Sequence, residues 1–160
     1  MTALAEAGLT IELPKGWDGQ IRTAGQSAAS AVRTANDGPR PIEGVVLHAA
    51  SFPLPPERGD YGSGAVEVMG GSDVLLCLLE HEQEATQTAL FARKGMPRLD
   101  PATFSPQSMQ RAIPGMAGSQ HFFQVAGRAF CLYVVVGSWH TRRPLVRAAD
   151  RVATSIRIDP

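Results

Sequence analysis

The feature that most constrains the fold is a pair of unbroken apolar runs, at residues 74–79 and 129–137. Successive side chains of a strand point to opposite faces of a sheet, so an unbroken apolar run is typical of a strand that is buried on both faces. A run as short as the first is also compatible with a buried helix segment. Its neighbourhood favours a central strand.

Further strands are expected on either side of the first run. Residues 9–13 alternate between apolar and polar side chains, and the turn at 14–17 that follows predicts an opening hairpin with Trp17 packed back onto the core. The tight Ala126-Gly127 turn predicts an antiparallel meander at the end of the chain. The other segments that we expect to form strands are 44–52, 107–113, 119–125, 128–136 and 155–158.

Two helices are predicted. In the segment 82–94, acidic residues come first, basic residues come last, and Gly95 and Pro97 follow, which matches helix dipole and stop signals. In the segment 144–154, Pro144 suits the first helical position, where a missing N–H costs no internal hydrogen bond.

Length and element order together predict the architecture. A chain of 160 residues has the size of a single domain, which we assign to residues 1–160, with loop-rich segments at about 23–41 and 97–106. Strands cluster in the middle of the chain, helices flank them, and there is no βαβ alternation. We therefore expect an α+β fold in which an antiparallel β-sheet is flanked by helices.

The chain carries no signal for a membrane or an oxidising compartment. Both apolar runs are well short of the ~20 residues that cross a bilayer, and residues 1–8 lack the basic start and apolar stretch of a secretory signal. Cys77 and Cys131 sit inside the apolar runs, where a free cysteine behaves as a small hydrophobe. A disulfide between them is the alternative if the two strands are neighbours. We expect a cytoplasmic protein without membrane insertion.

Motifs for metal, nucleotide and serine chemistry are incomplete. His81-Glu82 opens like an H-E-x-x-H zinc helix, but alanine occupies position 85, where the second histidine belongs. Ser63 lacks the glycines that a nucleophile elbow needs two residues before and after it. The glycines around it also fail as a phosphate-binding loop, because Glu67 replaces the third glycine. We expect no catalytic residue, metal or cofactor.

A cysteine nucleophile is the remaining alternative. Cys77 and His81 are four residues apart and would face the same side of a strand. The leucines around Cys77 favour the structural interpretation, since burial in apolar surroundings raises the pKa of a thiol and keeps it protonated.

The candidate binding residues lie on the C-terminal helix. Arg143, Arg147 and Arg151 recur every four residues and form one basic stripe, with Arg142 beside its start. A solvated helix face is the ordinary explanation. With a formal net charge of +0 and no aromatic residue in this helix, nucleic acid is not expected, and an acidic protein partner is the better candidate.

The order of features resembles the PsbP-like fold group, which includes the LpqN-type proteins of high-GC bacteria. The resemblance rests on the start Ile11-Glu-Leu-Pro14-Lys-Gly-Trp17, the strand 74–80, the late hairpin that ends at Val136, and the terminal helix that leads into 155–158. It implies an antiparallel sheet sandwiched by helices, used mainly for protein interaction or assembly. The chain lacks the lipoprotein signal and cysteine of the LpqN-type proteins.

Three functions follow as hypotheses. The first is a non-catalytic accessory or adaptor module that binds another protein. The second is an enzyme or small-ligand-binding protein whose site assembles only in the fold, for instance from Glu80, His81, His121 and Arg128 around a cleft. The third is a self-assembling structural protein that forms homo-oligomers through an exposed sheet edge.

Overall fold

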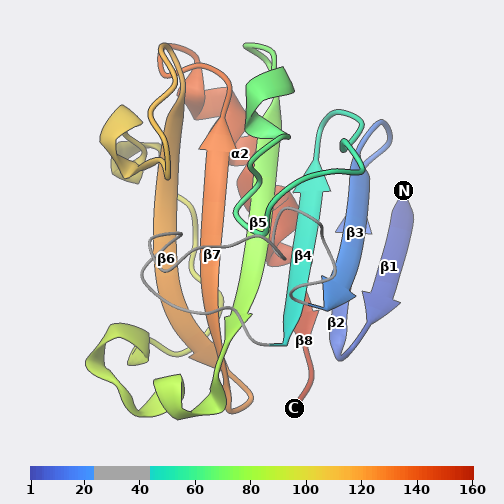
Figure 1. Ribbon diagram of the computed structural model, residues 1–160, viewed down its shortest axis with the longest axis vertical. Helices are drawn as coiled ribbons and strands as arrows, with labels where there is room; N and C mark the ends of the chain where they lie inside the picture. The colour runs from blue at the N-terminus through green and yellow to red at the C-terminus, as the bar shows by residue number, and fades with distance from the viewer. Residues whose placement is uncertain (24–43) are drawn as a thin grey trace.

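A five-stranded antiparallel sheet forms the centre of the protein (Figure 1). The computed structural model describes residues 1–23 and 44–160, so the predicted loop at 23–41 lies, apart from Thr23, outside the described residues. In spatial order the strands are β3 (Asp18–Thr23), β4 (Val45–Ala50), β5 (Val74–His81), β7 (Arg128–Val136) and β6 (Ala117–Val125).

The two unbroken apolar runs form neighbouring strands in the middle of this sheet. β5 and β7 pair over eight positions, from Val74 opposite Val136 to His81 opposite Ala129. Their side chains are buried on both faces, and only Glu80 and Arg128 are partly exposed. The prediction of a central strand at 74–79 is confirmed, as are the strands predicted at 44–52, 119–125 and 128–136.

A smaller sheet of three strands, β1 (Thr2–Glu6), β2 (Leu9–Leu13) and β8 (Arg157–Ile158), lies beside the large one. The chain does begin with a hairpin, but the prediction that residues 9–13 pair with the strand after the turn at 14–17 is wrong. β2 pairs with the preceding β1, whereas the strand after Trp17 enters the large sheet. The turn at 14–17 changes sheets, and Gly16 makes it with a φ of 87° that other residues rarely adopt. Trp17 packs against the core as predicted.

One face of the large sheet is covered by α2 (Arg142–Thr154) and the small sheet (Figure 1). α2 begins two residues before Pro144, so proline occupies the third helical position instead of the first. Its buried side chains are Val146, Ala149, Val152 and Ala153. They pack with the apolar side of β2 onto β5 and β7 and form the larger of the two main core clusters.

The opposite face is covered by loops and short 3-10 helices in the described residues. η1 (Val66–Val68) and the loop before it supply Phe52, Ala65 and Val66, and Met109 and Met116 complete the second cluster. Nearer the other end of the sheet, η2 (Gln83–Gln87) and η3 (Ala89–Phe91) bury Ala85 and Phe91 against Ala129.

The prediction of one helix over 82–94 is therefore wrong. Thr88 has extended backbone angles and separates η2 from η3. Tertiary contacts override the local helix signals here, because the chain must return to the edge of β6. There Gln124 N donates to Arg93 O at 2.8 Å and Gly95 N donates to Gln124 O at 3.0 Å.

The strand predicted over 107–113 is also absent. The 3-10 helix η5 (Pro106–Ser108) occupies its start, and the backbone N–H of Gln110 donates to the Tyr133 hydroxyl at 2.8 Å instead of pairing with a strand. The preceding stretch 97–106 is irregular as predicted, apart from the short η4 (Pro101–Thr103).

The fold class is α+β, with antiparallel sheets flanked by helical segments, which confirms the prediction from the sequence. In the described part of the chain, every helix is too short or too polar to cross a membrane.

The position of β5 predicts how much stability is lost when a core side chain on it is truncated. Leu76 is fully buried between Ala49 and Val134, so Leu76→Ala is expected to lower the free energy of unfolding by about 2–5 kcal/mol. Val68→Ala is the control, because Val68 is 60% exposed, and its effect should stay within about 0.5 kcal/mol. Urea unfolding of both variants measures this, and equal losses would contradict the placement of β5.

Candidate functional site

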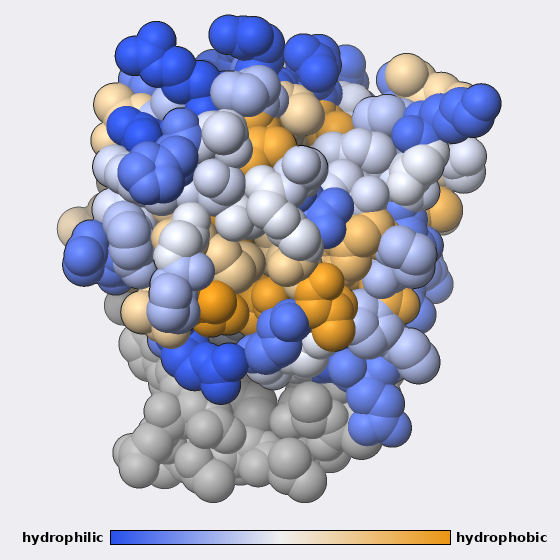
Figure 2. Space-filling model, turned by 90° about the horizontal axis from the view of Figure 1, so that it is seen from above, coloured by the Kyte–Doolittle hydropathy of each residue, from blue (hydrophilic) through white to orange (hydrophobic). Residues whose placement is uncertain are grey.

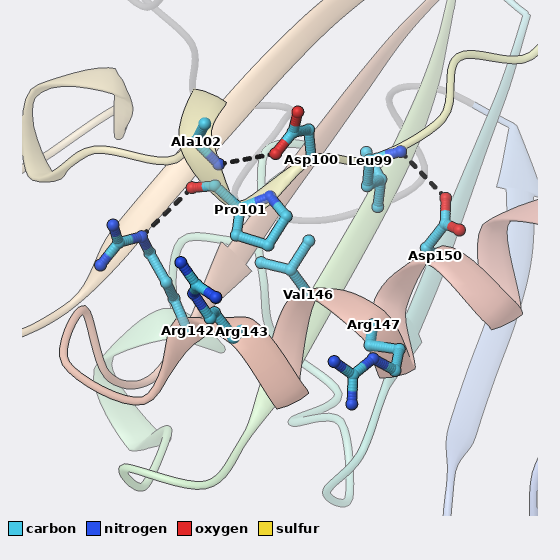
Figure 3. Close-up of a pocket in the computed structure, with 9 residues that line it drawn as sticks. All are labelled: Leu99, Asp100, Pro101, Ala102, Arg142, Arg143, Val146, Arg147 and Asp150. Atoms are coloured by element: carbon cyan, nitrogen blue, oxygen red, sulfur yellow. Dashed lines mark hydrogen bonds between the residues drawn. The ribbon is translucent and has the colours of Figure 1, made fainter.

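An open hollow of about 430 Å³ lies between the first turns of α2 and the loop that carries η4 (Figure 3). The helix side supplies Arg142, Arg143, Val146, Arg147 and Asp150, and the loop supplies Leu99, Asp100, Pro101 and Ala102. Three of the four arginines predicted from the sequence thus line one concave surface, which we call the basic hollow.

Arg142 fixes the loop to the helix. Its Nε donates to Pro101 O at 3.2 Å and its Nη1 donates to Trp139 O at 3.1 Å. The guanidinium also lies over the Trp139 ring, 3.6 Å from the ring centre, in cation–π geometry. Arg142 is therefore a structural tether as well as a wall of the hollow, and it is only partly exposed.

Arg143 and Arg147 differ from Arg142, because both are exposed and neither has a side-chain hydrogen bond or an ion pair within residues 1–23 and 44–160. The two acids of the hollow are already engaged. Asp150 pairs with Arg98 and accepts from Leu99 N at 2.9 Å, and the Arg98 hydrogen bond lowers the pKa of this carboxyl. Asp100 caps η4 by accepting from Ala102 N. Neither Arg143 nor Arg147 is therefore neutralised by an ion pair in the part of the chain that the structure describes.

The placement of these arginines opposes the helix dipole. The N-terminus of a helix carries partial positive charge and favours acidic side chains, yet the first turn of α2 holds Arg142 and Arg143 and no acid. Thr141 at the N-cap makes no side-chain capping bond. Helix N–H groups and guanidinium groups therefore sum to a positive potential at this end of α2.

Arg151 does not line the basic hollow. It is exposed one turn further along α2 and lines a separate hollow with Trp17 and Val152. Figure 2, seen from the end of the molecule at which α2 begins, shows strongly hydrophilic side chains along the margin that the helix forms.

The four residues proposed to surround a cleft do not converge. Glu80 and Arg128 form a bidentate pair at 2.8 and 3.0 Å, which strengthens the link between β5 and β7. His81 follows Glu80 on the same strand, so it points to the opposite face, where it packs on Phe91. His121 lies two strands away from Glu80, roughly 10 Å across the sheet, and bonds to Ser119.

A buried polar network on the second face of the sheet was missed by sequence reasoning. His48 is fully buried on β4, and its Nδ1 accepts from Arg58 Nε at 2.8 Å while its Nε2–H donates to Asp60 O at 2.7 Å. Arg22 from β3 donates to Asp60 Oδ1 and to Arg58 O. The network pins the loop that carries Arg58 and Asp60 onto the sheet. No sequence motif marks it, because its members come from three separate segments.

The network also decides the role of Cys77. His48 lies directly opposite Cys77 in the β4–β5 register, but both of its ring nitrogens are already hydrogen-bonded. His81 is four residues along the strand, roughly 13 Å away. Burial raises the pKa of the Cys77 thiol and raises that of Cys131 to about 12. Both cysteines are free, and within residues 1–23 and 44–160 neither His48 nor His81 is placed to act as a base for Cys77.

The described residues also complete neither the serine motif nor a metal site. Ser63 is exposed in the loop that runs over β5, without the strand-to-helix turn of a nucleophile elbow. In the part of the chain that the structure describes, no three histidine, cysteine or acidic side chains lie close enough together to hold a metal ion.

No family model, curated protein or solved structure matches this chain. The resemblance to the PsbP-like fold group stays a prediction.

The buried network predicts a loss of stability in acid. Burial is the main reason that the pKa of His48 falls to about 3, far below its ordinary 6.5. His48 takes up a proton near pH 6.5 in the unfolded chain but not in the folded chain. Its contribution to the free energy of unfolding is therefore complete above pH 6.5. It is lost as the pH falls toward 3, by at most about 1.4 kcal/mol per pH unit.

Urea unfolding between pH 7.5 and pH 5 checks this. His48→Gln should be less stable than wild type at pH 7.5, because it breaks the network, yet it should lose less stability on acidification. Parallel curves for the two proteins would show that His48 is not the responsible group.

Proposed function

We propose that the chain is a non-catalytic accessory or adaptor module that binds an acidic segment of a partner protein in the basic hollow. The observation that carries the proposal is the pair of exposed arginines, Arg143 and Arg147, neither of which forms an ion pair with an acid of the described residues. Carboxylates of a partner would pair with these two arginines through charge-assisted, bidentate hydrogen bonds.

The helix terminus supports the same proposal. Two arginines in the first turn of α2 lower the stability of the helix, because their charges oppose its dipole. An anionic partner would relieve this repulsion, and the relief would add to the binding free energy. The hollow is preformed, because Arg142 and the Asp150–Leu99 bond fix both of its walls. A preformed site loses little conformational entropy on binding.

A protein suits this site better than nucleic acid. Phosphate backbones are bound by extended basic surfaces, whereas this chain has a formal net charge of +0 and two acids line the hollow itself. The PsbP-like resemblance, whose group serves mainly in protein interaction, is an analogy in the same direction. We place the module in the cytoplasm, where free thiols such as Cys77 and Cys131 persist.

Charge reversal in the hollow tests the proposal. A fluorescein-labelled hexaglutamate peptide should bind the wild-type protein at low ionic strength and dissociate as salt is added. Arg143→Glu together with Arg147→Glu should weaken binding at least tenfold by fluorescence anisotropy. The control is Arg93→Glu, because Arg93 is exposed but lies outside the hollow. Equal affinities of the two variants would refute the assignment.

Replacing Arg143 with an acid should stabilise the fold while it weakens peptide binding. Arg143→Glu places a carboxylate in the first turn of α2 and one turn before Arg147, so the free energy of unfolding should rise by about 0.3–1 kcal/mol. Thermal unfolding at low salt measures the change. A binding loss accompanied by destabilisation would mean that Arg143 supports the fold instead of a partner.

A further inference from the structure

The second hollow beside α2 differs in chemistry from the basic hollow. It has a volume of about 280 Å³ and is lined mainly by apolar groups of Met1, Pro14, Trp17, Ala148 and Val152. The turn that ends with Trp17 N donating to Pro14 O holds the indole against the core. We call this surface the Trp17 hollow.

The Trp17 hollow carries charges of both signs at its rim. Glu12 and Arg151 both line it and are exposed, so its charged groups give no net preference for a carboxylate, and its apolar lining is its distinguishing chemistry. The Trp17 indole N–H makes no hydrogen bond to the residues that the structure describes. Tryptophan is enriched among the residues that dominate binding energy at protein interfaces, so a half-buried tryptophan suits contact with an apolar partner side chain.

α2 is the shared wall of both hollows. Val146 and Arg147 face the basic hollow, and Ala148 and Val152 face the Trp17 hollow. A helix is about 10 Å wide and rises about 6 Å per four residues, so a path across the exposed side of α2 from one hollow to the other is about 12 Å long. Four residues of extended chain cover that distance.

Exposed arginines border this path at both ends. Arg147 lines the basic hollow and Arg151 lines the Trp17 hollow, and neither forms an ion pair within the described ranges 1–23 and 44–160. Positive charge therefore continues across the exposed side of α2. An extended chain that is acidic at one end matches this charge along its course.

We propose that the two hollows form one bipartite site for an extended acidic peptide of the partner. Its carboxylates occupy the basic hollow, and an apolar side chain about four residues away occupies the Trp17 hollow. This inference rests on the proposed function, because it assumes that the basic hollow binds carboxylates. It adds the sequence pattern of the segment and the direction in which the segment crosses α2.

Three labelled peptides test the pattern. The first carries three glutamates, a Gly-Ser-Gly spacer and a terminal leucine amide. The second has serine in place of leucine, and the third has the leucine directly after the glutamates. Burying a leucine side chain strengthens binding about tenfold or more, so the first peptide should bind at least tenfold more tightly than the other two.

The protein carries its own reporters. Its two tryptophans lie one at each hollow, since Trp17 lines the apolar one and Trp139 stacks on Arg142 at the basic one. In the Trp139→Phe variant, the fluorescence of Trp17 should shift with the first peptide only. In the Trp17→Phe variant, the fluorescence of Trp139 should respond to every peptide that binds.

A substitution in the wall separates the two halves of the site. Ala148 is half-buried on the side of α2 that faces the Trp17 hollow, so Ala148→Gln fills this hollow without adding a charge and at little cost in helix propensity. It should remove the preference for leucine and leave binding of the serine peptide unchanged.

The outcomes are distinct. Equal affinities of the first two peptides, with Trp17 silent, would overturn the bipartite site and leave the basic hollow standing. Failure of all three peptides to bind at low salt would overturn both proposals. A preference for leucine that survives Ala148→Gln would place the apolar contact elsewhere and also refute the Trp17 hollow.

Discussion

The burial of β5 and β7 on both faces is the constraint on which the rest of the structure depends. Two adjacent strands with apolar side chains on each side cannot leave either face in water, so each face must be covered. α2 and the small sheet cover one face, and loops and 3-10 helices cover the other. The positions of both hollows follow, because each lies beside α2 where it rests on the sheet.

The two covers are held by different forces. α2 presents a regular apolar side, so apolar packing holds it to the sheet, and the hydrogen bonds of Arg142 and Asp150 tie its outer side to the loop at 98–102. The loop that carries Arg58 and Asp60 buries polar side chains as well as apolar ones where it crosses the sheet. His48, Arg58, Asp60 and Arg22 hydrogen-bond to one another there, and of their buried side-chain atoms only Arg22 Nε lacks a partner within the described residues. A buried network of this kind gives the loop one position, because each polar group is costly to leave without its partner.

The arginines at the start of α2 are the clearest conflict between local and global preference. Basic side chains oppose the helix dipole in the first turn, and no acid within the described residues pairs with Arg143 or Arg147. Places where a sequence breaks a local rule without a structural gain are the places where function is expected. A site built on the helix itself is more rigid than one built on a loop, which suits recognition of short segments.

The sequence by itself determined the central strands, the late β6–β7 hairpin, the C-terminal helix and the arginine stripe, because unbroken apolar runs, tight turns and helix spacing are local patterns. Only the tertiary structure decided the segments 82–94 and 107–113, where contacts with β6 and with the Tyr133 hydroxyl outweigh local signals. It also joined Arg142 to Pro101, separated Arg151 from the other arginines and assembled the His48 network. Pairings between distant segments depend on which faces the sheet buries, and no single stretch of sequence contains that information.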